Sequence, residues 1–451
     1  MKSKNKNLDN EHRIYNLLGI KVKIKDSKKV LNNKISNLQK QLDDVFNKTE
    51  FIYRRIQNNS KQIIKAYGNI IRITQTSKPR VLIFEPNFDA HSEVVPGYAK
   101  YFLDLGCSVD VLMLQSNYDL GALVRLQDDN LHIFTIEMET INDFFAINEI
   151  SLYDKIVLSS HIVYWANFDR KKIYKDIKDT ERAPFIIDSK EQDIPIESVF
   201  VCYPQLLKHY DKISVVEHHL EKCPRKLLND NKVISLSEVA ITKKNNVVIA
   251  NPHYFGTVKV HTLRGGGLTN FIMIGGLHAF RKNTNILFIA IKKLVARGIK
   301  NFKITVIGYG ELTGCGDDIK NFFDIKGRIS YPEMYECLEN ADFILPLFDP
   351  NNKDHNRYIE RGTSGIFQLI YGFKKPCIIH NKFSSVHYLS DENSIIYQNN
   401  DELAIKMQEC INMNSETYNT IVENLSETAN KIYENGKYNL DKYVLNCEAI
   451  K

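Results

Sequence analysis

The sequence predicts an α/β protein with two doubly wound parallel sheets, each built from alternating strands and helices. Between residues 78 and 264, short apolar strands alternate with helical or loop segments. The glycine-rich stretch at residues 265–267 interrupts this pattern, and a second series of the same kind follows over residues 268–415. Because alternating strands and helices build parallel sheets with helices on both faces, we expect two such domains with a ligand cleft between them.

The first series opens with an apolar strand, a helix and a second apolar strand. RVLIFEP is the first strand, residues 93–105 have a helical pattern that Gly106 ends, and SVDVLML follows. The later expected strands are LHIFTIE, KIVLSS, PFIID, KISVV and NVVIAN. Ligands of open parallel sheets gather beyond the carboxyl ends of the strands, so polar residues at those ends are candidates for a site.

The second series begins with the strand FIMIGGL, followed by a helix near residues 285–297 that Gly298 ends. It continues with the strands KITVIG and FILPLF and with an acidic helix near residues 331–340. The last helices, over residues 416–451, are long enough to cross back onto the first domain. We therefore expect the two domains to be connected twice.

Residues 1–75 differ from the rest of the chain. YNLLGIKVKIK alternates apolar and basic residues, as a strand or a short ribbon does. From Leu31 to Ile63, mainly apolar residues recur at alternating spacings of four and three and form a stripe along one side of a helix. This is the a/d repeat of a coiled coil, with polar residues at Thr49 and Asn59. The pattern fits either a homo-oligomer formed through residues 31–63 or one long helix that lays the same stripe on the globular body. The flanking basic side chains also suit peripheral contact with anionic lipid.

The composition is that of a globular protein, with 43% hydrophobic residues among 451. The 60 basic and 54 acidic residues leave a formal net charge of +6, which does not indicate a nucleic-acid partner. The sequence has no apolar run of about 18 residues and no pattern of a secretory signal. We expect a cytoplasmic protein whose eight cysteines are isolated thiols. Peripheral contact with the inner face of the cytoplasmic membrane is an open alternative.

The stretch RGTSGIFQLIYGFKKPCII, residues 361–379, is the strongest candidate for ligand binding. Gly362 and Gly365 let the backbone approach a ligand closely, while Thr363 and Ser364 offer hydroxyl groups at the start of a short apolar helix. The unpaired N–H groups of a first helical turn attract an anion. Small residues before a helix are also ordinary capping residues, so both interpretations stay open. We expect Gly372 to end the helix.

Four fragments, in their order along the chain, resemble the nucleotide-sugar-binding domain of GT-B glycosyltransferases of the family 1/4 type. They are FIMIGGLHAFRKN, ITVIGYGEL, GRISYPEMYECLENADFILPLF and GTSGIFQLIYGFKKPCII, and the resemblance covers about residues 269–396. The first domain resembles the acceptor domain of these enzymes more loosely, through SVDVLML, with Cys107 where the family usually has histidine. YNLLGIKVKIK resembles the amino-terminal stretch of some bacterial surface-polysaccharide glycosyltransferases.

The resemblance implies two Rossmann-like domains facing a cleft, and the transfer of a sugar from a nucleotide-sugar to a glycan or lipid-linked acceptor. In the family, a basic pair after the first strand of the donor domain grips the diphosphate. Gly276 stands at the arginine position, and Arg281 or Lys282 matches the later basic position. A solvated basic pair on a loop is the alternative. Gly308, after the strand KITVI, belongs to the same implied donor site.

The family's pair of glutamates is incomplete in this chain. Glu360 and Gln368 have the right separation, but an alignment that runs on through Gly372 needs one extra residue. The resemblance implies that Gln368 replaces a ribose-binding glutamate, since an amide still hydrogen-bonds a diol. A buried, satisfied glutamine is the alternative. Together with Gln368, the turn residues complete the implied donor site: Thr363, Ser364 and Gly365.

A nucleotide-sugar loses a diphosphate, so the reaction needs positive charge and N–H dipoles where negative charge develops. We expect neither a divalent metal nor a cofactor. An inverting enzyme also needs a base, which a retaining one can lack, and the stereochemistry is open. His91 is the first candidate, with Asp89 and Glu93 as alternatives or orienting partners. His161 and Asp188 follow later strands and are expected on the acceptor side, although both also fit capping or turn roles.

Two other classes of function fit the same architecture. A sugar-nucleotide 2-epimerase shares the two domains and the grip on the diphosphate, but it needs a set of carboxylates in the cleft for proton transfer. A non-catalytic assembly protein would depend on the coiled-coil-like arm, and the departures at Gly276 and Gln368 would then reflect lost donor binding. The donor sugar, the nucleotide base and the linkage do not follow from the sequence.

Overall fold

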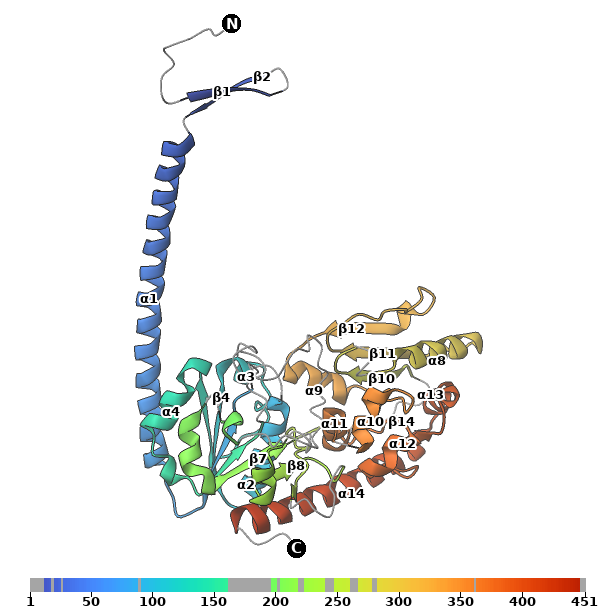
Figure 1. Cartoon of the computed structure of the whole chain (residues 1–451). Coiled ribbons are helices and arrows are strands. Elements are labelled where there is room, and N and C mark those ends of the chain that lie inside the picture. The colour runs from blue at the N-terminus through green and yellow to red at the C-terminus, as the bar shows by residue number, and fades with distance from the viewer. Residues whose placement is uncertain are drawn as a thin grey trace. The chain divides into compact units, whose positions relative to one another are not determined.

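The computed structural model divides the chain into two compact units, residues 1–66 and residues 67–451 (Figure 1). The structure describes residues 12–17, 20–25, 27–87, 91–160, 196–200, 203–217, 223–239, 247–259, 267–277, 282–360 and 362–446. No helix within these ranges is long and apolar enough to cross a membrane.

The first unit contains a hairpin followed by a long helix. Strands β1 (His12–Leu17) and β2 (Ile20–Lys25) pair in antiparallel register, with Tyr15 opposite Val22. Helix α1 (Ser27–Ile73) then runs for 47 residues and ends within the second unit. The predicted ribbon and the predicted helix are both confirmed. The side chains of Ile35, Leu38 and Leu42 on the predicted stripe are exposed, and self-association through this stripe stays a prediction.

Seven parallel strands form the sheet of the first lobe, a name used here for residues 67–259. Their order across the sheet is β5-β4-β3-β6-β7-β8-β9. The strands are β3 (Arg80–Glu85), β4 (Ser108–Leu114), β5 (Leu131–Ile136), β6 (Lys155–Leu158), β7 (Ile213–Glu217), β8 (Val233–Ser235) and β9 (Val248–Ile249). β3 and β4 are buried along their whole length, which explains their continuous apolar sequences. PFIID lies outside the described residues.

Helices cover this sheet and connect its strands. They are α2 (Val95–Asp104), α3 (Gln115–Asp119), α4 (Ile141–Ile147) and α7 (Arg225–Asn229), with a longer 3-10 segment, η5 (Pro204–Lys212). The helix expected at residues 93–105 begins later, because a 3-10 turn, η1 (Ser92–Val94), precedes α2. Gly106 follows it with φ of 80°, as a left-handed helix end requires.

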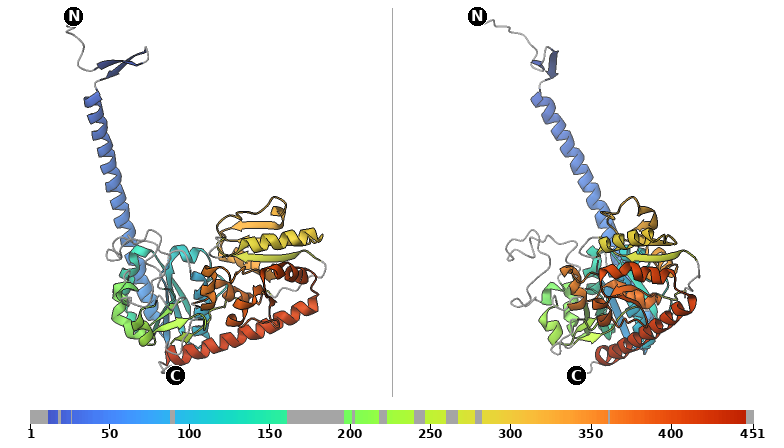
Figure 2. Two further views of the ribbon diagram at one scale, coloured as in Figure 1. Left: turned by 45° about the vertical axis from the view of Figure 1, so that its right-hand side comes forward. Right: turned by 90° about the vertical axis from the view of Figure 1, so that its right-hand side faces the viewer.

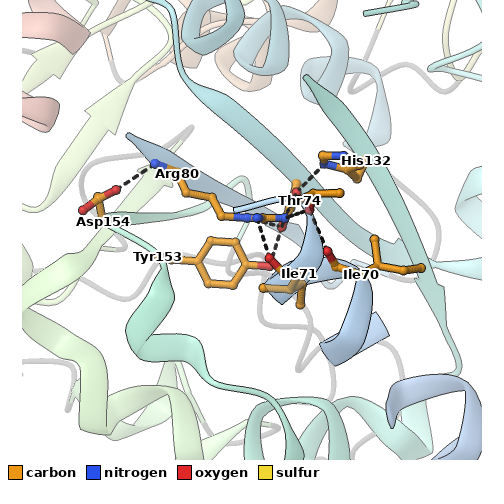
Figure 3. A network of polar contacts seen from close by, with 8 residues as sticks. Ile70, Ile71, Thr74, Arg80, His132, Tyr153 and Asp154 are labelled. Carbon is orange, nitrogen blue, oxygen red and sulfur yellow. Dashed lines mark hydrogen bonds and ion pairs between the residues drawn. The ribbon is translucent and has the colours of Figure 1, made fainter. Parts of the chain in front are cut away.

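A buried network ties the end of α1 to the first lobe's sheet (Figure 3). The Arg80 guanidinium donates to Asp110 through Nε at 2.8 Å and to the Ile71 carbonyl at 2.8 Å. Asp110 is fully buried and also accepts from the Tyr153 hydroxyl, at 2.7 Å, and faces His132 Nδ1 at 2.9 Å. Each lone pair of this buried carboxylate that faces a donor offsets part of its desolvation cost.

The second lobe, residues 267–414, contains a four-stranded and a two-stranded parallel sheet. The larger has the order β12-β11-β10-β13 and the smaller pairs β14 with β15. A parallel bridge between Ile344 and Cys377 connects the two. The strands are β10 (Thr269–Ile274), β11 (Phe302–Ile307), β12 (Phe323–Gly327), β13 (Phe343–Ile344), β14 (Ile378–His380) and β15 (Ile395–Tyr397). The parallel sheets of the two lobes confirm the predicted fold class, an α/β protein with two doubly wound, Rossmann-like units.

The helices of the second lobe are α8 (Thr284–Ala296), α9 (Tyr331–Glu339), α10 (Lys353–Glu360), α11 (Gly365–Phe373), α12 (Asn381–Ser384) and α13 (Leu403–Ile411). Ser330 and Glu333 form a capping box at the start of α9. The prediction that Gly372 ends its helix is wrong. α11 continues to Phe373, and Lys374 takes the left-handed conformation instead, with φ of 49°.

Gly372 instead permits a close approach between the lobes. A Cβ at this position would lie 2.5 Å from the His253 carbonyl oxygen and 2.4 Å from Phe255 Cδ2. Helix α14 (Ser415–Asn439) provides a second connection, because Leu425 is buried in the core of the second lobe while Tyr433 stacks on a tyrosine of α2. Figure 2 shows α14 running along both lobes.

Candidate active site

The amino terminus of α11 offers backbone N–H groups without partners in the described part of the chain. Ser364 is its N-cap residue, with an extended backbone, but its side chain makes no capping hydrogen bond. The amide of Phe367 donates to the Ser364 carbonyl at 3.0 Å, whereas no described residue accepts from the amides of Gly365 and Ile366. A helix start of this kind attracts an anion through both its free donors and its dipole.

A cavity of about 100 Å³ lies between this helix start and the first lobe. It brings together six of the predicted site residues, two from the first lobe and four from the second. The six predicted residues are His91, Glu93, Thr363, Ser364, Gly365 and Gln368. The other lining residues are Val94, Leu236, Arg357 and Tyr358. Residues that are more than 250 positions apart in the sequence therefore share one small space.

Two polar groups on the second-lobe side are buried without a hydrogen-bond partner among the described residues. They are the Thr363 hydroxyl oxygen and Nε of Arg357. The Arg357 guanidinium donates to the Tyr358 hydroxyl at 2.6 Å and lies 4.7 Å from the centroid of that ring. Since a buried polar group without a partner is costly, these two atoms and the first turn of α11 form a cradle suited to an oxyanion.

Arg357 was missed by the sequence analysis. It lies on α10, and the turn that separates α10 from α11 brings its side chain back to the helix start. The available signal was a basic residue on the helix directly before the small-residue turn, with an exposed glutamate, Glu360, closing that helix. Without the path of the turn, this signal does not distinguish Arg357 from an arginine on the surface.

On the first-lobe side, His91 and Glu93 follow β3. His91 has a left-handed backbone, with φ of 70° and ψ of 0°, which is uncommon for a residue with a side chain and occurs often at functional sites. Glu93 Oε2 accepts from the hydroxyl of Tyr331, a second-lobe residue, at 3.1 Å. Burial, and the nearby Glu93 carboxylate, raise the pKa of that phenol well above its usual range. The phenol therefore stays a donor and holds the carboxylate.

Behind this segment lies Glu85, the last residue of β3. Its carboxyl group is fully buried and accepts from the Asn87 amide at 2.7 Å and from the Ser159 hydroxyl at 2.6 Å. Burial raises the pKa of Glu85 to about 8, which favours its neutral form over a second negative charge beside Glu93. Asn87 in turn donates to Ser160 at 3.1 Å, which fixes the first residues of the segment that leads to His91.

The Gln368 side chain forms hydrogen bonds with the first turn of α11. Its side chain is buried, and its amide nitrogen, in the orientation that satisfies its neighbours, donates to the carbonyls of Ser364 at 3.1 Å and Gly365 at 3.3 Å. The side chain that was predicted to face ribose thus also stabilises the helix start. Its contact with ribose stays a prediction.

Lys282 and Gly308 do not line this cavity. Lys282 is buried, and its Nζ lies 3.4 Å from the Pro346 carbonyl. Gly308 has φ of 145°, and a Cβ there would lie 2.1 Å from the Gly275 carbonyl oxygen, so a glycine is required where β10 and β11 end side by side. The other predicted site residues, Asp89, His161, Asp188 and Arg281, lie outside the described residues.

Polar contacts also hold the two lobes together. Arg125 of the first lobe donates to Glu339 of α9 at 2.6 Å, and the Lys259 amide donates to the same carboxylate at 3.2 Å. The Tyr331 amide donates to the Leu120 carbonyl at 2.9 Å. Within the described residues, no group of three or more His, Cys, Asp and Glu side chains is arranged to hold a metal ion.

No protein-family model and no curated protein matches the chain. Solved structures do match. TarM is 13% identical, and the match covers 82% of this chain and 98% of TarM, with a TM-score of 0.47. An α-glucosyltransferase in complex with UDP and a 13-mer DNA is 12% identical, and the match covers 80% of this chain and 100% of that one, also with a TM-score of 0.47. A putative UDP-N-acetylglucosamine 2-epimerase from Listeria monocytogenes is 10% identical, with coverage of 82% and 98% and a TM-score of 0.45. The strand order and register of the parallel sheets in the two lobes define the α/β fold.

Proposed function

We propose that the chain is a metal-independent GT-B glycosyltransferase that moves a sugar from a nucleotide-sugar to a glycan or lipid-linked acceptor. The pathway we propose is the biosynthesis of a bacterial surface polysaccharide, because of the resemblance of YNLLGIKVKIK to enzymes of that kind. The single observation that carries the proposal is the cavity in which an anion cradle on one lobe faces an imidazole and a carboxylate on the other.

The cradle suits the leaving group of such a reaction. As the bond between the sugar carbon and the phosphate oxygen breaks, the electron pair stays on the diphosphate. The free amides of Gly365 and Ile366, the dipole of α11 and the Arg357 guanidinium are aimed at that developing charge. The Thr363 hydroxyl supplies a further donor in the same place. Arg281 is proposed to act on the same diphosphate.

The first-lobe side suits the acceptor. In an inverting reaction, the acceptor oxygen forms the new bond to the sugar while its proton passes to a base. His91 is our first candidate for this base, with Asp89 and Glu93 as alternatives, and His161 and Asp188 are proposed to line the acceptor side. In a retaining reaction these groups would orient the acceptor. Contact of the basic N-terminus with lipid and self-association through residues 31–63 are further proposals.

Calorimetry of the full chain against a panel of nucleoside diphosphates and nucleotide-sugars tests the proposal. We expect at least one nucleotide to bind. Arg357→Met should weaken that binding by about 1.5–3 kcal/mol, the scale of a hydrogen bond to a charged group, and Arg281→Ala should do so on the same scale. The matched control is Arg297→Met, because the Arg297 guanidinium is exposed and donates to Gln408 at 2.9 Å. Its nucleotide affinity should be unchanged.

The same samples separate the alternatives. A folded protein that binds no nucleotide of the panel would overturn the proposal and favour the assembly protein. A bound nucleotide-sugar that yields an epimer without any acceptor would favour the 2-epimerase. The described cavity contains one carboxylate, that of Glu93, and this supports a transferase over a mechanism that needs several.

A further inference from the structure

A second and larger cavity lies between the lobes beside α14. We call it the hinge cavity; its volume is about 320 Å³. The first lobe contributes Ser237 and Asn251, the second lobe contributes Tyr371 and the segment Val386–Tyr388, and α14 completes the wall. Both lobes and the helix that connects them therefore meet at its surface. A molecule bound there would contact all three.

The lining is polar but nearly balanced in charge. Glu238 and Lys431 are its acidic and basic residues, and the rest of its polar surface consists mainly of amides and hydroxyls. Asn251 is nine-tenths buried, and its Oδ1 lies 3.2 Å from His253 Nδ1. Its Nδ2 donates to no residue in the part of the chain that the structure describes. This amide donor is open to the cavity, where water or a ligand oxygen can accept its hydrogen bond.

Aromatic surface accompanies these polar groups. Tyr388, at the rim, is 46% exposed and has a left-handed backbone with φ of 56°. Burial, and the Glu238 carboxylate of the first lobe near its hydroxyl, raise the pKa of Tyr388, and the residue borders the cavity. An amphipathic ring beside amide and hydroxyl groups offers both an apolar face and polar contacts. This combination fits a molecule with apolar C–H faces and many hydroxyl groups, and it does not fit a strongly anionic one.

The hinge cavity adjoins the candidate active site. Leu236 lines both cavities. His387, which lines the hinge cavity, faces the Tyr358 carbonyl through Nε2 at 2.9 Å, and the Tyr358 hydroxyl accepts from Arg357. The two cavities thus share a lining residue, and the hydrogen bonds of His387 and Arg357 to Tyr358 connect their walls.

We propose that the hinge cavity is a separate binding site for a neutral sugar or glycan segment. The proposal does not depend on the proposed transferase activity, because the ligand contacts neither the cradle at α11 nor His91. A ligand that contacts both lobes would also stabilise the folded chain, since it binds the native state alone.

Crystals of the full chain soaked separately with glucose, with maltotriose, with inorganic phosphate and with indole test the ligand class. Density for either sugar in the hinge cavity, within hydrogen-bond distance of Asn251 Nδ2, is the expected result. A hinge cavity that stays empty with both sugars, or that takes only phosphate or only indole, overturns the proposal.

Two substitutions that fill the cavity from opposite walls extend the test to solution. Asn435→Trp acts from α14 and Ser237→Leu from the first lobe, so either variant suffices if the other does not fold. Maltotriose should raise the melting temperature of the parent chain and of the control Asn430→Trp, an exposed position of α14 outside the lining. The rise should be lost in both cavity variants, and an equal rise in all four proteins would refute the site. Arg357→Met should retain the full rise, which separates this result from a failure of nucleotide binding.

Discussion

Replacing Arg80 by methionine should expose the cost of a buried charge that has lost its partner. Arg80 is 3% exposed and Asp110 is fully buried. In the wild type, the guanidinium gives two hydrogen bonds to Asp110, at 2.8 and 2.9 Å, and one to the hydroxyl of Thr74 at 3.0 Å. Methionine keeps much of the length and apolar contact of the side chain but removes every one of these donors (Figure 3).

The geometry sets the expected magnitude. After the substitution, Asp110 keeps the Tyr153 hydroxyl at 2.7 Å and His132 at 2.9 Å, but it loses its bidentate positive partner. Breaking a buried ion pair on one side typically costs about 3–5 kcal/mol, because the remaining charge is left without compensation. We expect a loss in this range. The double variant Arg80→Met/Asp110→Leu should be more stable than Arg80→Met alone, since it removes the stranded charge as well.

Urea unfolding of the full chain, followed by circular dichroism, measures these differences. The matched control is Arg72→Met. Arg72 lies near the same end of α1 and pairs with Glu149 at 2.9 Å, but both side chains are about half exposed, so its loss should cost no more than about 1 kcal/mol. If Arg80→Met proved as mild as Arg72→Met, or if the double variant were less stable than Arg80→Met, the reasoning would be refuted.

Two further predictions concern the contacts between and beside the lobes. Gly372→Ala should lower the free energy of unfolding by about 1–3 kcal/mol, because the added Cβ overlaps the His253 carbonyl. Urea unfolding measures this change. A gain in stability, which an unhindered helical glycine would show on replacement by alanine, would contradict the prediction. Burial lowers the pKa of His387 from 6.5 to about 4. Between these two pH values the imidazole is protonated in the unfolded chain but neutral in the folded chain. Folding is therefore favoured less and less as the pH falls from 6.5 toward 4. Between pH 7 and pH 5 this loss amounts to roughly 2 kcal/mol. When the stability of His387→Gln is measured over the same pH range, this loss should be absent. If the parent and the variant showed the same dependence of stability on pH, the loss could not be attributed to His387.

The strands were predictable because each buried parallel strand is a short apolar run between turn residues. RVLIFE and SVDVLML are read correctly for this reason. The start of α2 was placed too early because residues 92–94 form a 3-10 turn, which has nearly the same periodicity over so few residues. Local sequence therefore determined the type of each element better than its ends.

The parts that sequence did not reveal depend on the packing of distant segments. Gly372 sits where a helix end is expected, but its neighbours are His253 and Phe255, and only the contact between lobes shows that the missing Cβ matters. Arg357 reaches the cavity because of the path of one turn. The hydrogen bond from Tyr331 to Glu93 joins residues 238 positions apart. No periodicity or spacing in one sequence encodes such a pairing.

The cavity also bears on which first-lobe group is the better base. Glu93 accepts from Tyr331, and its Oε1 lies only 3.7 Å from the Cβ position of Gly365, at the cradle itself. A carboxylate there would repel a bound diphosphate, and one of its oxygens is already occupied by the hydrogen bond from the Tyr331 hydroxyl. His91 carries no negative charge and lies on the same wall. We therefore favour His91 for accepting the proton, with Glu93 orienting the acceptor hydroxyl through the rigid contact that Tyr331 provides.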